Sequence, residues 1–382
     1  MSRPITFFVH HQGRGHARRT MAIVRELPKS RPVSVLTADP SLFDGFERDI
    51  EIVTLPNMIG APVPTPALHD QPTPSTMHCV PLGLRPMRQT MRRILDHLDE
   101  RDSGLFVIDV SAELALLARI ASVPAIKIRM HGNRCDPGHR AAYEACTAML
   151  APYDARLEQS DYPAWARNKT FYTGGLCTSP TNSHDKVAAR SALGLPADRE
   201  IVVVMTGGGG AGTPYAPLTM AARAAPDTLF VTVGPLHREG HETDFANLVN
   251  HGWVENSSDY LAAADIVLAS AGDNTVHEIA RAGRPYICAP EWRYFDEQQR
   301  KAESLAALGA AIHLKIWPGD LDGWRELLEQ ARALDVAALQ PLHDPHAASR
   351  AAVWLETTLE RLWAGADEDP RIAAPTLSAI AR

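Results

Sequence analysis

The sequence predicts an α/β protein with two doubly wound, Rossmann-like domains that face each other across a cleft. Its 382 residues exceed what one ordinary hydrophobic core serves. Short apolar runs, such as 5–9, 33–37 and 201–205, alternate with helical hydrophobic patterns in both halves of the chain. Ligands of such sheets bind in the crevice beyond the carboxyl ends of the strands, so we expect the functional residues there.

Composition narrows the class of protein. Hydrophobic residues make up 45% of the chain and charged residues 22%, as in a soluble globular protein. The net charge of −7 argues against a nucleic-acid partner, because such proteins are usually basic. The 5 cysteines, without a C-x-x-C pair, indicate neither a disulfide framework nor a zinc site. The sequence carries no signal-peptide pattern and no membrane-length apolar run, so we expect a cytoplasmic protein that is possibly membrane-associated through a peripheral contact.

Residues 270–299 carry the most informative pattern. They follow the apolar run 265–269 and begin with small residues, which leave backbone N–H groups open at the start of a helix. A helix start of this kind binds anions. Asp273 and Asn274 can cap the helix, and Thr275 adds a hydroxyl group.

Polar side chains further along this stretch converge on the same place. Glu278 lies about one helical turn into the helix and faces back toward its start. A second helix opens at Asp296 and brings Gln298 and Gln299 to the same sheet edge. Open N–H groups suit a pyrophosphate, a carboxylate suits ribose hydroxyls, and amides suit sugar hydroxyls. Each residue alone fits an ordinary surface position, but the set indicates a nucleotide diphosphate-sugar site.

The stretch resembles the donor-binding segment of GT-B glycosyltransferases, most closely the MurG-type enzymes of glycosyltransferase family 28. Their pattern is Ser-Gly-x-x-Thr-x-x-Glu, then Gly-x-Pro, then Asp-x-Gln-Gln. The matching residues here are Ser270, Gly272, Thr275, Glu278, Gly283, Pro285, Asp296, Gln298 and Gln299, with Ala271 as a one-residue departure. The resemblance implies a GT-B fold. It also implies metal-independent, inverting transfer of a sugar from a nucleotide diphosphate-sugar, UDP-linked, to an acceptor hydroxyl.

The resemblance implies further donor contacts in the second half. A glycine-rich loop that lacks the Lys and Ser/Thr of a P-loop would touch the donor phosphates through Gly207, Gly208 and Gly209. Trp253 and Val254 would hold the nucleobase, with a core-filling role as the alternative for Trp253. The donor is a co-substrate, and we expect neither a cofactor nor a metal.

The glycine loop after the run 5–9 is the matching feature of the first half. In MurG-type enzymes this loop ends in a histidine and faces the acceptor, as His16 would here. A neutral imidazole can take a proton from a hydroxyl at pH 7, so His16 is the candidate general base, with a capping or solvated histidine as the alternative. Arg18 occupies the third glycine position of a dinucleotide motif, which disfavours a Rossmann cofactor.

Asp109, at the end of the run 105–109, is the expected catalytic partner of His16. Its place at the end of a strand puts it at the same crevice, and several inverting GT-B enzymes orient their histidine with such an acid. It would fix the imidazole tautomer and stabilise the imidazolium that forms. The alternative is that Asp109 caps the next helix.

Acceptor contacts are expected from the first half. The candidates are Gly13, Arg14, Gly15, His131 and Arg134. The cations Arg14, Arg18 and Arg19 either hold an anionic group on the acceptor or are ordinary surface residues. The acceptor stays open among a small molecule, a glycolipid and a polymer.

The proline-rich segment 57–82 has little periodicity, so we expect a long irregular segment that forms part of the acceptor cleft. Beyond it, one helical face is apolar and comprises Met87, Met91, Ile94 and Leu98. The outer face carries Arg85, Arg88, Arg92 and Arg93. That basic face meets a phospholipid surface or a phosphorylated acceptor, or it is simply solvated.

These observations divide the chain into five parts. We expect an N-terminal acceptor-binding domain at 1–173, a linker at 174–186 and a donor-binding domain at 187–345. A helix at 346–363 would cross back to the first domain, and 364–382 would be a flexible tail. Two other functions stay open: a non-hydrolysing nucleotide-sugar 2-epimerase, which needs several acids about the sugar, and a catalytically silent nucleotide-sugar-binding protein, which needs no base.

Overall fold

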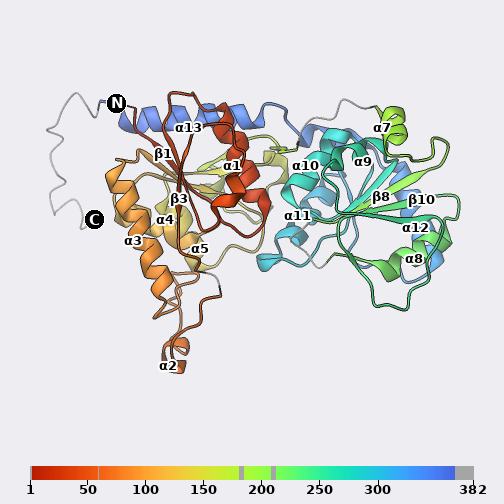
Figure 1. Ribbon diagram of the computed structural model, residues 1–382, viewed down its shortest axis with the longest axis horizontal. Coiled ribbons are helices and arrows are strands. Elements are labelled where there is room, and N and C mark those ends of the chain that lie inside the picture. Colours follow the sequence, from red (N-terminus) through yellow and green to blue (C-terminus); the bar gives the residue numbers. More distant parts are fainter. Residues whose placement is uncertain (1, 59, 180–184, 208–211, 366–382) are drawn as a thin grey trace.

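The computed structural model describes residues 2–58, 60–179, 185–207 and 212–365. Two β-sheets lie side by side along the long axis of the molecule, each flanked by helices (Figure 1). The strand pairs of both sheets are parallel. Parallel sheets are covered by helices on both faces, which explains why their central strands are apolar throughout.

The first sheet has the strand order β3-β2-β1-β4-β5-β6-β7. Its strands are β1 (Ile5–Phe8), β2 (Val33–Thr37), β3 (Glu51–Thr54), β4 (Leu105–Ile108), β5 (Ala125–Ile128), β6 (Ala148–Ala151) and β7 (Thr170–Tyr172). The longer helices around it are α1 (Arg14–Glu26), α3 (Arg85–Glu100), α4 (Ala112–Ile120) and α5 (Pro137–Ala145). The central strands β1 and β4 are buried along their whole length, as their apolar sequences require.

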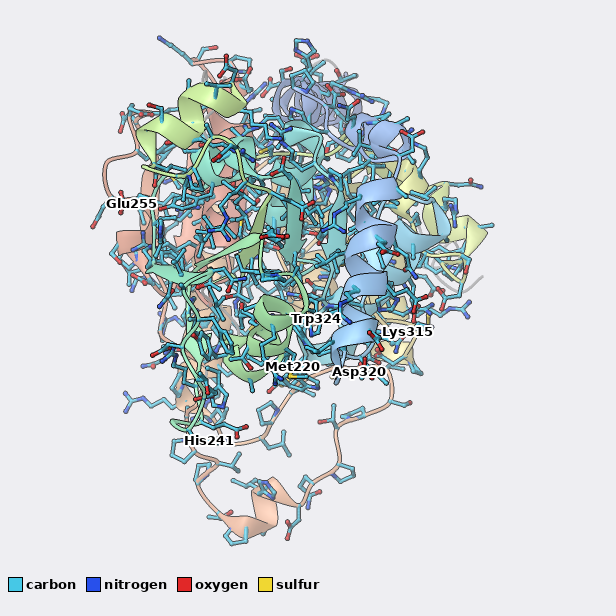
Figure 2. All side chains as sticks on the ribbon, turned by 90° about the vertical axis from the view of Figure 1, so that its right-hand side faces the viewer. Met220, His241, Glu255, Lys315, Asp320 and Trp324 are labelled. Atoms are coloured by element: carbon cyan, nitrogen blue, oxygen red, sulfur yellow. The ribbon has the colours of Figure 1, made fainter. Side chains whose placement is uncertain are left out.

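The second sheet has the order β12-β10-β8-β13-β14-β15. Its strands are β8 (Ile201–Met205), β10 (Leu229–Val233), β12 (Leu248–Gly252), β13 (Ile266–Ala269), β14 (Tyr286–Cys288) and β15 (Ile312–His313). The helices are α7 (Lys186–Ala192), α8 (Tyr215–Ala224), α9 (Ser257–Ala263), α10 (Asp273–Ala282), α11 (Glu297–Ala307) and α12 (Leu321–Ala333). Trp324 of α12, labelled in Figure 2, is fully buried in the core on one face of this sheet.

The apolar runs of the sequence correspond to strands that the structure contains. The runs 5–9, 33–37, 105–109, 201–205 and 265–269 match β1, β2, β4, β8 and β13 within one residue at each end. The runs did not predict β3, because it lies at the edge of its sheet and alternates between half-buried and exposed residues. A sheet edge therefore lacks the continuous apolar signal of a central strand.

The helix α13 (Ala347–Trp363) follows the second sheet in sequence but packs against α1 of the first (Figure 1). Leu355 and Leu359 lie in the apolar core between them, and Glu356 pairs with Arg31 at 2.8 Å. The indole Nε1 of Trp363 donates to the carbonyl of Gly104 at 2.8 Å. Among the described residues, the helices are too short or too polar to span a membrane.

The two halves share a continuous interface. Tyr153 and Leu157, which follow β6, are buried in the same apolar cluster as the strands of the second sheet. Polar contacts add to this core: Asn133 donates to Asp296 at 2.7 Å, and Arg134 pairs with Glu297 at 2.9 Å. The relative placement of the two sheets is thus fixed by both burial and charge.

Residues 57–58 and 60–84, here called the arm, extend from the first half beyond the body of the molecule (Figures 1 and 2). As predicted, the arm is largely irregular; it includes the short helix α2 (Pro66–His69). The arm is anchored to the first half where it returns from α2: the backbone N–H groups of His78 and Cys79 donate to Glu113 at 3.0 and 2.6 Å. Whether the arm borders an acceptor stays a prediction.

His277 of α10 makes stability depend on pH. Its imidazole is buried, and burial lowers its pKa from 6.5 to about 4. Between pH 6.5 and 4 the unfolded chain therefore binds a proton that the folded chain does not. The contribution of neutral His277 to the free energy of unfolding is present above pH 6.5 and is lost as the pH falls toward 4. As the pH is lowered, we expect the free energy of unfolding of His277→Gln to fall less steeply than that of the wild type. Urea titrations at pH 7 and pH 5 measure both slopes, and equal slopes would contradict the expectation.

Candidate active site at the facing sheet edges

Each sheet has a switch point, where neighbouring strands send their connections to opposite faces. In the first sheet it lies between β1 and β4, and in the second between β8 and β13. A crevice opens at such points because the loops diverge. The first turn of α1, with His16, and the residue after β4, Asp109, meet at the first. Gly207, which follows β8, and the start of α10 lie at the second.

His16 and Asp109 are in contact at the first switch point, as predicted. The Nδ1 atom of His16 lies 2.8 Å from the Oδ2 atom of Asp109. The alternative for Asp109 is wrong, because Ser111 caps α4 by accepting from the N–H of Leu114 at 3.3 Å. A carboxylate only accepts hydrogen bonds, so a neutral His16 that bonds Asp109 carries its proton on Nδ1, with Arg19 Nη2 3.2 Å from the same atom, and keeps a lone pair on Nε2. This is the tautomer that a general base requires.

Arg19 holds Asp109 in its ionised form. Burial alone would raise the pKa of the Asp109 carboxyl, but the charges of Arg19 and His16 hold that pKa well below its ordinary value. Arg19 Nη2 donates to both oxygens of Asp109 at 2.9 Å, while Nη1 reaches Asp273 of the second half at 3.4 Å. Both sequence-based readings of Arg19 were wrong, because it is buried in an ion-pair network rather than free for an acceptor or exposed on the surface. Its spacing of three residues from His16 on one helix is the signal that could have found it.

The turn after Asp109 is held in an unusual conformation. Val110 has a φ of 62°, which is rare for a β-branched residue and costs conformational energy. The Nζ atom of buried Lys127 donates to the carbonyls of Val110 and Ser111 at 2.6 and 3.1 Å. Lys127 therefore supports the turn that directs Asp109 toward His16. Lys127 is the one polar residue of the buried strand β5, whose sequence is AIKI, and this isolated charge is the signal that could have found it.

On the donor side, the capping predicted for Asp273 and Asn274 was wrong. The N-cap residue of α10 is Gly272, and no side chain of the described residues caps the helix. The carboxylate of Asp273 is instead bound by Lys301 and Arg19. No side-chain cap therefore covers the N–H groups of the first turn among the described residues, and their binding of an anion stays a prediction.

The Asp-x-Gln-Gln segment differs in part from expectation. Gln298 is buried, and its Oε1 atom accepts from the N–H groups of Ala271 and Glu291 at 3.1 and 2.8 Å, so its carbonyl holds two loops together. The helix begins at Glu297, because Asp296 has a left-handed backbone with φ of 53°, and Asp296 binds Asn133 across the interface. Gln299 is half-buried, and its reading of sugar hydroxyls stays a prediction.

Glu278 is buried rather than turned toward bulk water. Burial raises the pKa of its carboxyl, while hydrogen bonds from Ser179 and Ser257 lower it. The core-filling alternative for Trp253 was wrong, because the indole is 64% exposed directly after β12.

The other donor candidates are placed as follows. Val254 is half-buried and packs against the core, and Gly207 follows β8 with open space where a Cβ would lie. Gly208 and Gly209 lie outside the described residues.

Among the acceptor candidates, Gly13 and Arg14 are exposed and Gly15 lies beside Asn274 of α10. His131 was a wrong candidate: it is 1% exposed, and its Nε2 atom bonds the carbonyl of Leu157 at 2.8 Å. Arg134 was expected to be free for an acceptor, but Glu297 binds it and its guanidinium lies 4.6 Å from the centre of the Phe295 ring. Both side chains stabilise the interface.

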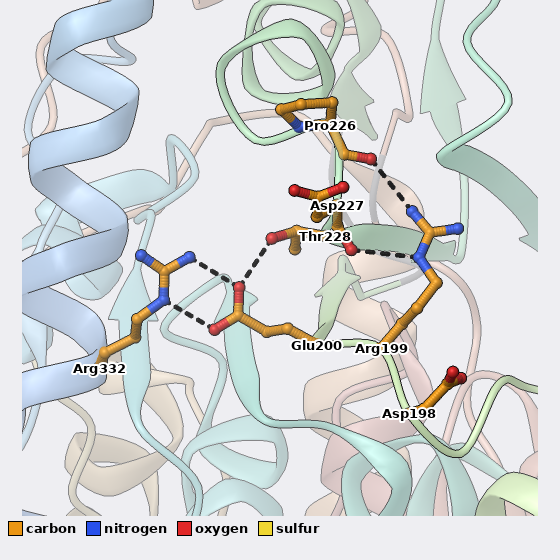
Figure 3. A pocket seen from close by; sticks show the side chains of 7 residues that line it. All are labelled: Asp198, Arg199, Glu200, Pro226, Asp227, Thr228 and Arg332. Carbon is orange, nitrogen blue, oxygen red and sulfur yellow. Dashed lines mark hydrogen bonds and ion pairs between the residues drawn. The ribbon is translucent and has the colours of Figure 1, made fainter.

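A concavity of the second half lies away from these residues. It has a volume of about 620 Å³ and is lined by charged side chains at the amino ends of β8 and β10, where Glu200 bonds Arg332 and Thr228 (Figure 3). Because ligands of parallel sheets bind at the carboxyl ends, size alone does not indicate the functional site.

Comparison with known proteins decides the family. Residues 221–317 match the glycosyltransferase family 28 C-terminal domain. The UDP-N-acetylglucosamine--N-acetylmuramyl-(pentapeptide) pyrophosphoryl-undecaprenol N-acetylglucosamine transferase of Cutibacterium acnes is 32% identical over 262 residues, which cover 64% of this chain and 69% of that protein. The chain belongs to glycosyltransferase family 28. Another family 28 protein of the same name, from Caldicellulosiruptor saccharolyticus, is 28% identical over 60% of this chain, and the match spans 62% of that relative's length.

Solved structures show the GT-B fold of this family 28 protein, as predicted. MurG of Acinetobacter baumannii superposes with a TM-score of 0.62 at 14% identity, over 94% of this chain and all of that chain. The UDP-GlcNAc 2-epimerase of Neisseria meningitidis superposes with a TM-score of 0.56, also at 14% identity and with the same coverage. At such identities the likeness establishes the fold alone. The family 28 match contains α10 and Glu278, while His16 and Asp109 lie outside it.

Proposed function

We propose that this protein is a glycosyltransferase that moves a sugar from a UDP-linked donor to an acceptor hydroxyl with inversion. The observation that carries the proposal is the His16–Asp109 pair, joined through Arg19 to the uncapped start of α10. A base for the acceptor and an anion site for the donor thus face each other from the two sheets. Each lies at the switch point of its sheet, where such folds bind ligands.

The residues divide the reaction between them. The N–H groups at the start of α10 and the helix dipole would bind the pyrophosphate and stabilise the negative charge that develops as the bond to the sugar breaks. Nε2 of His16 would take the proton of the acceptor hydroxyl as its oxygen bonds to the sugar carbon. Asp109 would stabilise the imidazolium that results. Glu278 and Gln299 remain the candidates for ribose and sugar hydroxyls, and the mechanism uses no metal or cofactor.

The relatives suggest a donor and an acceptor to test. Their name includes UDP-N-acetylglucosamine and a lipid-linked pyrophosphate, so a UDP-sugar and a glycolipid are the first compounds to test. A thermal-shift screen of nucleotides tests the donor, because a ligand that binds only the folded state raises the melting temperature. UDP and UDP-sugars should stabilise the protein. If NAD or FAD stabilised it instead, the proposal would fail.

The 2-epimerase alternative is weaker because the acids near His16 are held in their ionised form. Asp109 and Asp273, which flank His16 and Arg19, are bound by buried cations and are held ionised with lowered pKa values. They are thus poorly suited to exchange protons with a sugar carbon. Epimerised product from a UDP-sugar, in the absence of any acceptor, would reverse this preference.

Trp253 gives a prediction for the donor. If the exposed indole stacks on the uracil ring, Trp253→Ala should weaken UDP binding about fivefold, since aromatic contacts of this kind contribute roughly 1 kcal/mol. The fold should be unaffected because the side chain is exposed. Calorimetric titration with UDP measures the change, with Trp165→Ala as the control. Unchanged affinity would remove Trp253 from the donor site.

A peripheral membrane contact would involve α3. Its outer face is basic and its arginines Arg85, Arg88, Arg92 and Arg93 are exposed, as predicted. Each cation near an anionic surface contributes about 1 kcal/mol, so the protein should float with anionic vesicles and release at high salt. Arg88→Glu with Arg93→Glu should abolish flotation. Equal binding of the wild type and this double variant to neutral vesicles would contradict this role for the helix.

A further inference from the structure

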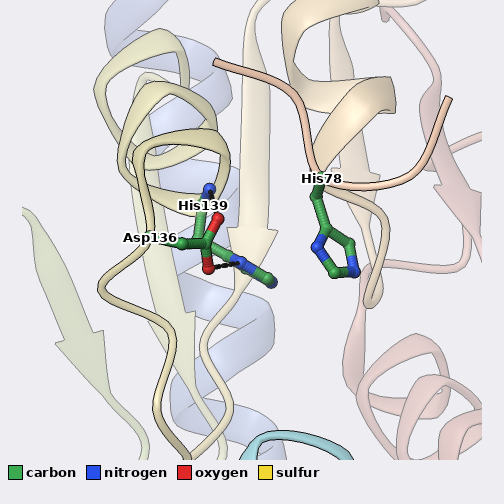
Figure 4. Close-up of side chains that lie close together, drawn as sticks. All are labelled: His78, Asp136 and His139. Carbon is green, nitrogen blue, oxygen red and sulfur yellow. Dashed lines mark hydrogen bonds and ion pairs between the residues drawn. The ribbon is translucent and has the colours of Figure 1, made fainter. Parts of the chain in front are cut away.

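A second cluster of ligating side chains lies outside the candidate active site. His78 belongs to the arm, Asp136 is the N-cap residue of α5, and His139 lies in the first turn of that helix. One ligand atom from each residue lies within 4.8 Å of the others, and Figure 4 shows the three side chains grouped where the arm passes α5. Two imidazoles and a carboxylate are the donor set that zinc and similar ions prefer.

The geometry of the cluster is close to that of a metal site. Asp136 accepts from the backbone N–H of His139 at 3.1 Å, and its Oδ2 atom lies 2.5 Å from Nδ1 of His139. The ring centres of His78 and His139 are 4.5 Å apart. Ligand atoms around a tetrahedral zinc ion are about 3.3 Å apart, given bond lengths of about 2 Å. Small shifts of these side chains would therefore suffice to form the coordination sphere.

Arg134 is the cation that faces this cluster from the neighbouring loop. Its Nη1 atom lies 3.4 Å from Nε2 of His139, which would repel a metal ion if the charge were unbalanced. Glu297 of the second half binds the same guanidinium at 2.9 Å and offsets that charge. The carboxylate of Asp136 is then left to attract a divalent ion.

We propose that His78, Asp136 and His139 form a binding site for a divalent transition-metal ion such as Zn²⁺, with water completing the coordination. The ion would tie the exposed arm to α5. It would do so next to the interface, because the ring of Phe295 from the second half lies 5.0 Å from that of His78 and 4.9 Å from that of His139. This site is separate from the catalytic chemistry and does not depend on the proposed transfer reaction. Sequence spacing did not indicate it, since the arm and α5 are far apart along the chain.

The test is metal binding to the full-length, untagged protein after treatment with a chelator. We expect one Zn²⁺ by calorimetric titration, and Co²⁺ should give the visible absorption of a site with nitrogen and oxygen ligands. His78→Ala should weaken Zn²⁺ binding at least tenfold while the fold is kept, because His78 is exposed. Asp136→Asn should weaken Zn²⁺ binding similarly, because the ionised carboxylate is lost. The fold should be kept in this variant too, since the amide oxygen can still cap α5.

His69 supplies the matched control. It lies on the same arm, is exposed, and has an acid neighbour, with 3.3 Å between its Nδ1 atom and Asp70. His69→Ala should leave Zn²⁺ affinity unchanged. The proposal is overturned if the wild type binds no Zn²⁺ at micromolar concentration, or if His78→Ala binds as tightly as the wild type. Equal losses in the His69 and His78 variants would also overturn it, because they would indicate unspecific surface binding.

Discussion

Replacing His16 by alanine should lower kcat for sugar transfer by about 10²–10⁴-fold, the range that a lost general base usually costs. UDP binding should be kept, because the donor contacts proposed here lie on the second half. Asp109→Asn should produce a loss of similar size, since an amide at 2.8 Å no longer fixes the proton on Nδ1 of His16. The measurement is kcat with UDP-N-acetylglucosamine and an acceptor, together with calorimetric titration of UDP.

Two observations separate a catalytic role of His16 from a structural one. His237→Ala removes an exposed histidine of β11 (Leu236–His237) in the other half and should leave the rate unchanged. The His16→Ala protein should also unfold in urea close to the wild-type midpoint, because His16 is only partly buried. Unchanged kcat in His16→Ala would remove this histidine from the mechanism. A silent nucleotide-sugar-binding protein would bind UDP equally in both variants without any turnover.

Replacing Arg19 by methionine should destabilise the protein by about 3–5 kcal/mol, which is the usual cost of leaving a buried partner charge unpaired. Arg19 bonds both oxygens of Asp109 and reaches Asp273, and all these groups lie between the two sheets. Arg19→Lys should recover part of the loss, because an ammonium restores the charge but not the bidentate geometry. Transfer activity should fall as well, since Asp109 loses the contact that fixes it beside His16. Urea unfolding and kcat measure the two effects.

The pH dependence of this loss follows from Asp109. Its folded pKa is depressed, so its contribution is present above the unfolded value of about 4 and is lost as pH falls below it. The difference in stability between the wild type and Arg19→Met should therefore be largest near pH 7 and shrink toward pH 3. Arg25→Met is the matched control: Arg25 is on the same helix and pairs with Glu47, but it is exposed, so the change should cost less than 1 kcal/mol. Equal costs for both arginines would contradict the network.

The sequence predicted the sheets well because the signal for a central parallel strand is local. Each buried run, such as 201–205, is apolar without interruption, and the next polar residues mark the carboxyl end where ligands bind. That rule, together with the resemblance to MurG-type enzymes, predicted His16 and Asp109 at one crevice, and the structure brings them together. It also placed Gly272 at the start of α10 with its N–H groups open.

The state of each polar side chain at this edge could not be predicted in the same way. Asp273 and Arg19 form one buried ion-pair network, and Arg134 is paired with Glu297, although their sequence positions suggested free functional groups. His131 illustrates the same limit, since a polar turn after a strand predicted an accessible ring that is in fact buried against Leu157. In each case the deciding partner lies far away in sequence.

The sequence by itself determined the fold class, the strand ends at which chemistry is possible, and the family to which the chain belongs. The tertiary structure decided which of the residues there are free to act and which are neutralised, and it brought His78 of the arm to Asp136 and His139. The physical reason is the difference in the sequence range of the interactions involved. Strand and helix signals depend on neighbours along the chain, whereas burial, charge pairing and ligand geometry depend on residues that only folding brings together.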